Sequence, residues 1–72
     1  MRKAIALQIR LNGEPFEVKS AATVLELVLE LELDPKSVAV ERNLEIVPKS
    51  RHGEESLTPG DSIEIVEFVG GG

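Results

Sequence analysis

Apolar and polar residues alternate from Ala4 to Leu11. The Ile and Leu side chains of this segment fall on one face: Ile5, Leu7, Ile9 and Leu11. Such alternation predicts a β-strand with one buried face. Asn12-Gly13 follows and is a strong signal for a tight turn, because both residues tolerate positive φ. Pro15 then leads into a second short strand, Phe16–Lys19, so the segment predicts a β-hairpin.

Apolar residues at helical spacing come after the hairpin. Thr23 and Glu26 form a capping box, in which a hydroxyl and a carboxylate satisfy backbone N–H groups at a helix start. The apolar stripe of the expected helix consists of Val24, Leu27, Val28 and Leu31. We expect the helix to end at Asp34-Pro35, because the residue before proline avoids the helical region. A helix of about two and a half turns needs a sheet to pack against.

Strand patterns return in the second half of the chain. In order, the expected segments are a strand Val38–Arg42, a turn Asn43–Glu45, a short strand Ile46-Val47, a polar irregular segment Lys49–Ser56, an anchoring Leu57, a turn Thr58–Asp61 and a last strand that runs to Val69.

This order predicts an α+β fold of the β-grasp type, a mixed sheet of four to five strands packed on one helix. We expect the first and last strands to lie parallel at its centre, with Ile63 and Ile65 facing the helix. Residues 1–69 would form the single domain and residues 70–72 a flexible tail. Glu67 is in phase with the core residues, so either the strand leaves the core there or a bulge shifts its register.

Composition narrows the classes of function. None of the 72 residues is cysteine, which excludes disulfides, iron–sulfur clusters and thiolate zinc sites. A net charge of −5, from 13 acidic and 8 basic residues, argues against binding to a phosphate backbone. No stretch reads as a signal peptide or a membrane span, so a cytoplasmic location is expected.

Side chains typical of active sites are scarce. His52 is the only histidine, and its polar neighbours predict a solvated loop residue. Lys49, Arg51 and His52 form a small basic cluster that either contacts a partner or only keeps the loop soluble. Four acids read as solvated: Glu30, Glu32, Glu54 and Glu55. No spacing of these residues suits metal ligands, so we expect no metal site. Because active-site residue types are scarce, we also expect no bound cofactor and no enzyme activity.

The chain ends in three glycines. Holding them in one conformation would cost about 3–6 kcal/mol of backbone entropy, so the tail is expected to be mobile. A mobile tail with a free carboxylate suggests that Gly72 is itself the working group. A flexible spacer or a domain boundary is the alternative reading of the same residues.

Several segments together resemble the ThiS branch of the ThiS/MoaD sulfur-carrier family, whose members are ubiquitin-like β-grasp proteins. They are Leu11–Glu14, Thr23–Leu27, Val38–Asn43, Glu45–Ser50, Gly60-Asp61 and the terminal Gly71-Gly72. The compact length between hairpin and helix favours ThiS over MoaD. Leu44 departs from the pattern, because relatives commonly carry Gly there, and we expect it to alter that turn.

The resemblance implies a sulfur carrier whose terminal Gly71-Gly72 is the reactive end. A ubiquitin-activating-like adenylyltransferase of the ThiF type would use MgATP to adenylate Gly72, and a sulfur donor such as a cysteine desulfurase would convert it to a thiocarboxylate. A ThiG-type thiazole synthase would take the sulfur for the thiazole of thiamine. The alternatives are a carrier for another product, such as a molybdopterin synthase small subunit, or an interaction module with an inert tail.

Residues just before the terminal glycines are the expected docking surface for these partners: Val66, Phe68, Val69 and Gly70. A regular strand places Val66 and Phe68 on the sheet face away from the helix. The alternative is that Phe68 packs under a loop as a core residue.

Overall fold

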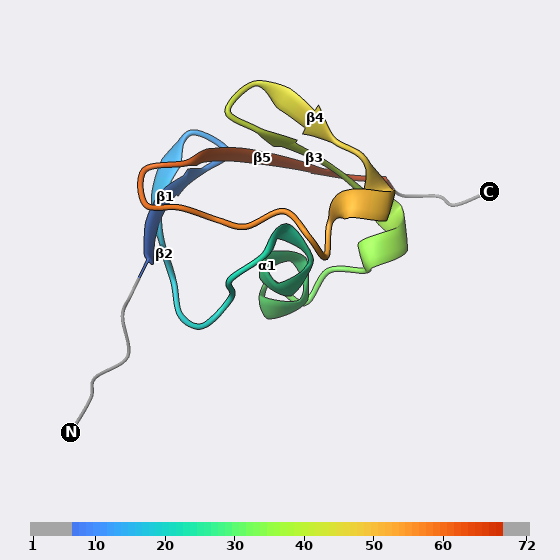
Figure 1. Ribbon diagram of the computed structural model, residues 1–72, viewed down its shortest axis with the longest axis horizontal. Helices are drawn as coiled ribbons and strands as arrows, with labels where there is room; N and C mark the ends of the chain where they lie inside the picture. The colour runs from blue at the N-terminus through green and yellow to red at the C-terminus, as the bar shows by residue number, and fades with distance from the viewer. Residues whose placement is uncertain (1–6, 69–72) are drawn as a thin grey trace.

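The computed structural model describes residues 7–68, which form a five-stranded mixed sheet with one α-helix packed against it (Figure 1). The elements in chain order are β1 (Leu7–Leu11), β2 (Glu14–Val18), α1 (Val24–Glu30), the 3-10 helix η1 (Pro35–Ser37), β3 (Val38–Arg42), β4 (Glu45–Val47), the 3-10 helix η2 (Lys49–Arg51) and β5 (Ser62–Glu67). This arrangement confirms the predicted β-grasp fold. Residues 4–6 of the expected first strand and the expected domain boundary after residue 69 lie outside the described residues.

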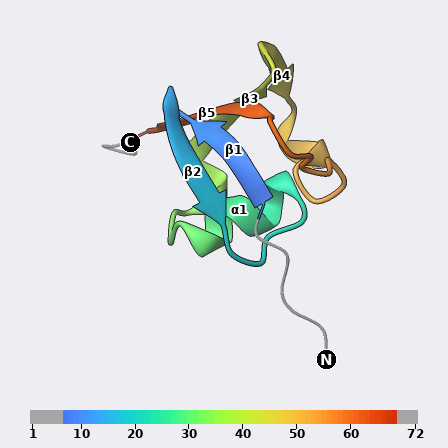
Figure 2. The same ribbon diagram turned by 90° about the vertical axis from the view of Figure 1, so that its left-hand side faces the viewer.

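The sheet has the strand order β2-β1-β5-β3-β4, so β5 occupies its centre. β1 and β5 are parallel, with Leu11 opposite Ile63, whereas the other neighbours are antiparallel. The predicted parallel pairing of the first and last strands is therefore confirmed. Figure 2 shows α1 on one side of the sheet, and no other α-helix of the described chain covers the opposite side.

The core between α1 and the sheet is aliphatic. α1 contributes Val24, Leu27 and Val28, and β5 contributes Ile63 and Ile65, as the apolar pattern predicted. The strands and loops add Ile9, Val18, Ala21, Val38, Val40, Val47 and Leu57. Each fully buried Val, Leu or Ile stabilises the fold by about 1.5–3 kcal/mol relative to an exposed side chain. The packing gives α1 the support that so short a helix requires.

Both ends of α1 are capped, but the helix ends earlier than predicted. Glu26 N donates to Thr23 Oγ1 at 3.2 Å, as expected for the capping box, while the Glu26 carboxylate accepts from Ala22 N at 2.7 Å. At the other end Glu32 has φ 63° and its N–H donates to Leu29 O at 2.9 Å. This left-handed residue closes the helix after Glu30, before Asp34-Pro35 is reached.

Two hairpin turns hold β5 from either side. Asn12 has φ 51° and Asn43 has φ 53°, and each is followed by a second residue with positive φ. The Asn12 Oδ1 atom accepts from Ile65 N at 2.8 Å, and the Asn43 Oδ1 atom accepts from Ser62 N at 2.9 Å. The turns therefore fix the central strand as well as their own hairpins.

Leu44 takes the second position of the β3–β4 turn with φ 72°, and its side chain is 85% exposed. We expected Leu44 to alter this turn, but the backbone still adopts the left-handed pair that an Asn-Gly turn uses. The expectation was wrong because the strain falls on Leu44 itself, at about 1–2 kcal/mol for a left-handed L-residue.

The register of β5 shows whether the strand leaves the core at Glu67 or contains a bulge before it. β3 and β5 pair without interruption from Arg42 opposite Ile63 to Val38 opposite Glu67. No bulge shifts this pairing, and the Glu67 side chain is exposed. The strand therefore extends past the end of the core.

Candidate functional site

The end of β5 is anchored immediately before the residues that form the expected reactive tail. Phe68 N donates to Ser37 O at 2.7 Å, which ties the chain to η1. The Lys49 Nζ atom donates to Lys36 O and Val38 O at 3.1 Å each, which links η2 to the same region. The body of the protein thus presents residue 68 from a fixed point. Val69, Gly70, Gly71 and Gly72 lie outside the described residues.

Val66 and Phe68 are the two expected docking residues that the structure describes. Val66 is 58% exposed and pairs with Ala39 of β3, on the sheet face opposite α1. Phe68 is 56% exposed, so it is not a core residue and does not pack under a loop. Exposed large apolar side chains at the end of the central strand are available for contact with another molecule.

The start of β5 is held by a charged network around Asp61. Its carboxylate accepts from Arg42 Nε at 2.8 Å, from Thr58 N at 2.8 Å and from Asn43 Nδ2 at 3.0 Å. Burial of Asp61 opposes ionisation, but these hydrogen bonds outweigh it and lower the pKa of Asp61 to about 2. The sequence predicted only the local turn role of Asp61, because nothing in it reveals that Arg42 and Asn43 meet the turn.

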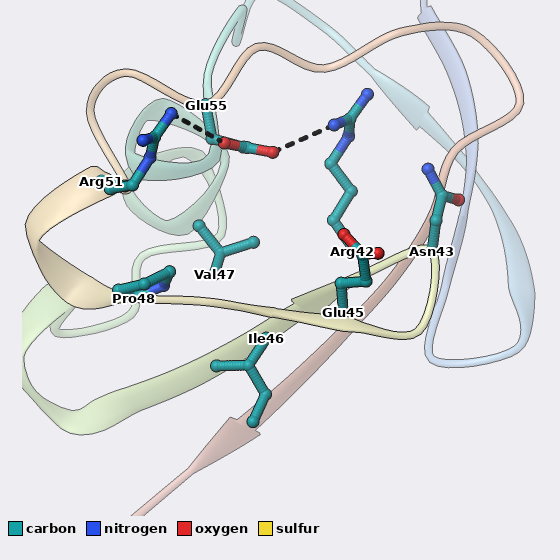
Figure 3. Close-up of a pocket in the computed structure, with 8 residues that line it drawn as sticks. All are labelled: Arg42, Asn43, Glu45, Ile46, Val47, Pro48, Arg51 and Glu55. Carbon is teal, nitrogen blue, oxygen red and sulfur yellow. Dashed lines mark hydrogen bonds and ion pairs between the residues drawn. The ribbon is translucent and has the colours of Figure 1, made fainter.

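A polar pocket lies beside this network, between β4 and η2 (Figure 3). Glu55 bridges two guanidinium groups there, with 3.0 Å to Arg42 Nη1 and 3.8 Å to Arg51 Nη2. Figure 3 shows Val47 and Ile46 on opposite sides of β4, with Val47 on the side of Arg51 and Glu55. Asp61 also pairs with Arg42, so two carboxylates balance the two guanidinium groups. The pocket therefore presents no unpaired arginine to an anionic ligand within the described residues.

His52 is buried, contrary to the prediction of a solvated loop residue. Its side chain is enclosed at 3% exposure, and Nε2 lies 2.9 Å from Val47 O. Its carbonyl accepts from Leu25 N at 2.8 Å, so the segment after η2 folds inward against α1. The contact between His52 and Val47 O joins the end of η2 to β4, and the buried imidazole is not accessible to a substrate.

The basic cluster expected at Lys49, Arg51 and His52 does not form one exposed surface that a partner could contact. Lys49 donates to backbone carbonyls, Arg51 pairs with Glu55, and His52 is buried. The polar sequence of the loop concealed these internal roles. The structure therefore gives these residues contacts within the protein, a role that neither the partner contact nor loop solubility had predicted.

Two of the four acids expected to be solvated are structural. The Glu30 carboxylate accepts from the backbone N–H groups of Lys19, Ser20 and Ala21 at 2.9, 3.2 and 3.1 Å. The hydrogen bond from Lys19 leads the causes that lower the pKa of Glu30. Glu30 thus fixes the loop from β2 to α1, a contact across 9–11 residues that no local pattern reveals. Glu55 is the second such acid.

No group of three or more His, Cys, Asp or Glu side chains within residues 7–68 converges to hold a metal ion. In the same part of the chain, no helix has the length and apolar character needed to cross a membrane. The exposed Val66 and Phe68 near the end of β5 are the expected site residues that this part of the chain presents for contact.

Comparison with known proteins places these features in a family. The ThiS family profile matches residues 9–72. The sulfur carrier protein ThiS of Bacillus subtilis is 45% identical over 65 residues, which cover 89% of this chain and 98% of that protein. A thiazole synthase of Paramagnetospirillum magneticum is 47% identical over 66 residues, which cover 92% of this chain. This chain spans about a fifth of the length of that synthase and of a second one from Magnetococcus marinus.

A solved structure agrees with the sequence matches. The crystal structure of a thiamine biosynthesis protein (ThiS) from Geobacter metallireducens matches with a TM-score of 0.77 and 30% identity, covering 92% of this chain and 100% of that chain. The profile match, the relative of similar length and the shared β-grasp structure lead to one conclusion: this chain belongs to the ThiS family.

Proposed function

We propose that this chain is a sulfur carrier of thiamine biosynthesis and that the carboxylate of Gly72 carries the sulfur. The observation that supports this most directly is the 45% identity to the Bacillus subtilis sulfur carrier over 98% of that protein. The family match also extends through residue 72 and so includes the terminal glycines.

The proposed chemistry begins with a carboxylate, which resists nucleophilic attack because oxide is a poor leaving group. A ThiF-type adenylyltransferase uses MgATP to form an acyl-adenylate on Gly72 and releases pyrophosphate. The terminal sulfur of a cysteine-desulfurase persulfide then bonds to the acyl carbon, and AMP leaves. A thiol cleaves the sulfur–sulfur bond, which forms a disulfide and frees the thiocarboxylate. The carrier supplies the carboxylate and no catalytic residue, so it is not itself an enzyme.

Glycine at the last two positions suits this role. Gly71 and Gly72 have no Cβ, so a narrow channel admits the chain and no side chain shields the carbonyl from attack. Ordering the tail in such a channel costs about 1–2 kcal/mol per residue, which contacts made elsewhere on the carrier must offset.

We propose that the end of β5 makes those contacts. Val66 and Phe68 are exposed, and the backbone at Phe68 is held against η1. A rigid body with an exposed aromatic anchor can dock while Val69 and Gly70 lead the terminus into the partner's active site. Buried aromatic anchors commonly supply most of the binding energy of an interface.

The proposed acceptor is a ThiG-type thiazole synthase in the cytoplasm. The names of two relatives support this choice, since both are thiazole synthases whose chains contain a segment similar to this protein. In those relatives the carrier-like segment and a synthase share one polypeptide. Where carrier and synthase are separate polypeptides, the carrier must instead bind the synthase.

Reconstitution of sulfur transfer tests the proposal. The chain is combined with a ThiF-type adenylyltransferase, a cysteine desulfurase, MgATP and thiazole synthase with its substrates, and the thiazole product is measured. The account predicts thiazole formation that depends on this chain. Sulfur transfer only to a molybdopterin precursor with a synthase large subunit would show a different acceptor. Transfer in neither assay, with a partner still bound, would show an interaction module with an inert tail.

A further inference from the structure

Two glutamates lie directly opposite each other on the face of the sheet that points away from α1. Glu41 of β3 pairs with Glu64 of β5 in the antiparallel register. Val40 and Ile65, their neighbours along the strands, are buried against α1. Because side chains alternate between faces, both carboxylates project away from α1.

This pairing is unfavourable within the protein itself. Residues directly opposite in an antiparallel pair have Cβ atoms about 4.5–5.5 Å apart, and like charges there destabilise the sheet. Between residues 7 and 68, neither carboxylate has an ion-pair partner. Two arginines of the sheet bond to other groups: Arg42 bonds Asp61 and Glu55, and Arg10 Nη2 donates to Gly13 O at 2.6 Å.

Exposed apolar residues border the glutamate pair. Ile46 of β4 pairs with Glu41 and is 76% exposed. Val66 follows Glu64 by two residues on the same face, and Ala39 lies opposite it. A partner that covered Ile46 and Val66 would remove water from around both carboxylates. Charge-assisted hydrogen bonds made there would be stronger than in open solvent.

We propose that this face, defined by Glu41, Glu64, Ile46 and Val66, binds a surface of thiazole synthase that presents an arginine between the two carboxylates. The inference rests on the proposed function, which supplies the identity of the partner. A guanidinium fits because its planar array of five donors can serve two carboxylates at once, which an ammonium does less well. A second copy of this chain is a poor occupant, since face-to-face contact would gather four glutamates.

The test measures the Kd for thiazole synthase by calorimetry, at about 50 mM and at about 500 mM salt. The variant Glu41→Gln/Glu64→Gln removes both charges and keeps the side-chain shape. The control Glu14→Gln/Glu54→Gln makes the same change in net charge at two exposed residues outside this face. We expect the first variant to bind about tenfold more weakly at low salt, and the control to stay within about twofold of the wild type. The difference should shrink at high salt.

The melting temperature of the first variant should equal or exceed that of the wild type, because a repulsive pair has been removed. Equally weaker binding of thiazole synthase by both variants would show that net charge alone steers binding, and would overturn the inference. Unchanged binding by the first variant would also overturn it. A wild-type dimer that the first variant abolishes would make a second copy the occupant and would also overturn it.

Sulfur loading by the adenylyltransferase separates this inference from the proposed function. If the wild type is loaded and binds the synthase, but the glutamate variant binds as well as the wild type, only the inference fails. If the wild type is neither loaded nor bound, the proposed function fails and the inference with it.

Discussion

Arg42, the last residue of β3, donates through Nε to Asp61 Oδ2 at 2.8 Å, immediately before β5 begins. The Asp61 side chain is only 5% exposed, whereas that of Arg42 is 25% exposed. Thr58 Oγ1 also donates to Asp61, at 2.9 Å. The turn that starts the central strand is thus fixed by a buried carboxylate. The position of the strand that leads to the tail depends on this pair.

Asp61 should make stability sensitive to acid. Its pKa is lowered from 3.8 to about 2, so the ionised carboxylate stabilises the fold above pH 3.8, and this contribution is lost as pH falls toward 2. The free energy of unfolding should therefore drop by about 2 kcal/mol more in the wild type than in Asp61→Asn between about pH 5 and pH 2. Urea titrations at several pH values measure the difference. Parallel pH profiles would contradict this role for Asp61.

The N-cap of α1 should contribute to stability and not to sulfur chemistry. Thr23 Oγ1 accepts from Glu26 N, so Thr23→Ala leaves a helix-start N–H unsatisfied. We expect a loss of about 0.5–2 kcal/mol in the free energy of unfolding, with sulfur loading unchanged. Thr23→Ser keeps the acceptor and serves as the control. An unchanged melting temperature for Thr23→Ala would show that the cap adds nothing.

Leu44 occupies a backbone conformation that suits glycine. Its φ of 72° strains the backbone, and its side chain, 85% exposed, gains no compensating burial among the described residues. Leu44→Gly should raise the free energy of unfolding by about 1 kcal/mol, because the left-handed penalty disappears. Leu44→Ala keeps the Cβ and should bring no comparable gain. Thermal unfolding of the three proteins decides the matter, and a lower melting temperature for Leu44→Gly would count against the strain.

Phe68 is expected to act in binding and not in folding. Phe68→Ala should weaken binding to the adenylyltransferase or thiazole synthase by at least about 1–2 kcal/mol, since an exposed aromatic becomes the buried anchor of the complex. Its melting temperature should change little because the side chain is 56% exposed. Leu29→Ala, at 52% exposure on α1, is the matched control and should leave binding intact. A sharp fall in melting temperature with normal binding would reverse this assignment.

Sequence patterns over a few residues correctly predicted the turns, the N-cap of α1 and the apolar faces, because neighbouring residues determine these features. The Asn12-Gly13 turn, the Thr23 cap and the stripe residues Val24, Leu27 and Val28 all appear where the sequence places them. Leu31, the fourth residue of the predicted stripe, is the C-cap of α1 and is only partly buried. The parallel pairing of β1 with β5 also follows from the order of the elements. Exposed Val66 was predicted from strand alternation alone.

Contacts between distant segments account for what the sequence did not reveal. Glu30 reaches the loop before α1, and Arg42 reaches Asp61 across 19 residues, so neither role has a local signature. His52 has polar neighbours but folds inward against Val47. The helix ends at Glu30 because Glu32 adopts a left-handed backbone conformation. Glycine is the usual residue at such a helix end, so a glutamate there gives no sequence signal that the helix stops.

Intact mass spectrometry of sulfur loading tests the central claim most directly. The wild type, a variant lacking Gly72 and a variant with one residue appended after Gly72 are each incubated with the adenylyltransferase, MgATP and a sulfur donor. The account predicts that only the wild type gains the mass of one sulfur in place of one oxygen, while all three melt at the same temperature. Normal loading of the extended or the truncated protein would contradict the assignment of the Gly72 carboxylate as the sulfur-carrying group.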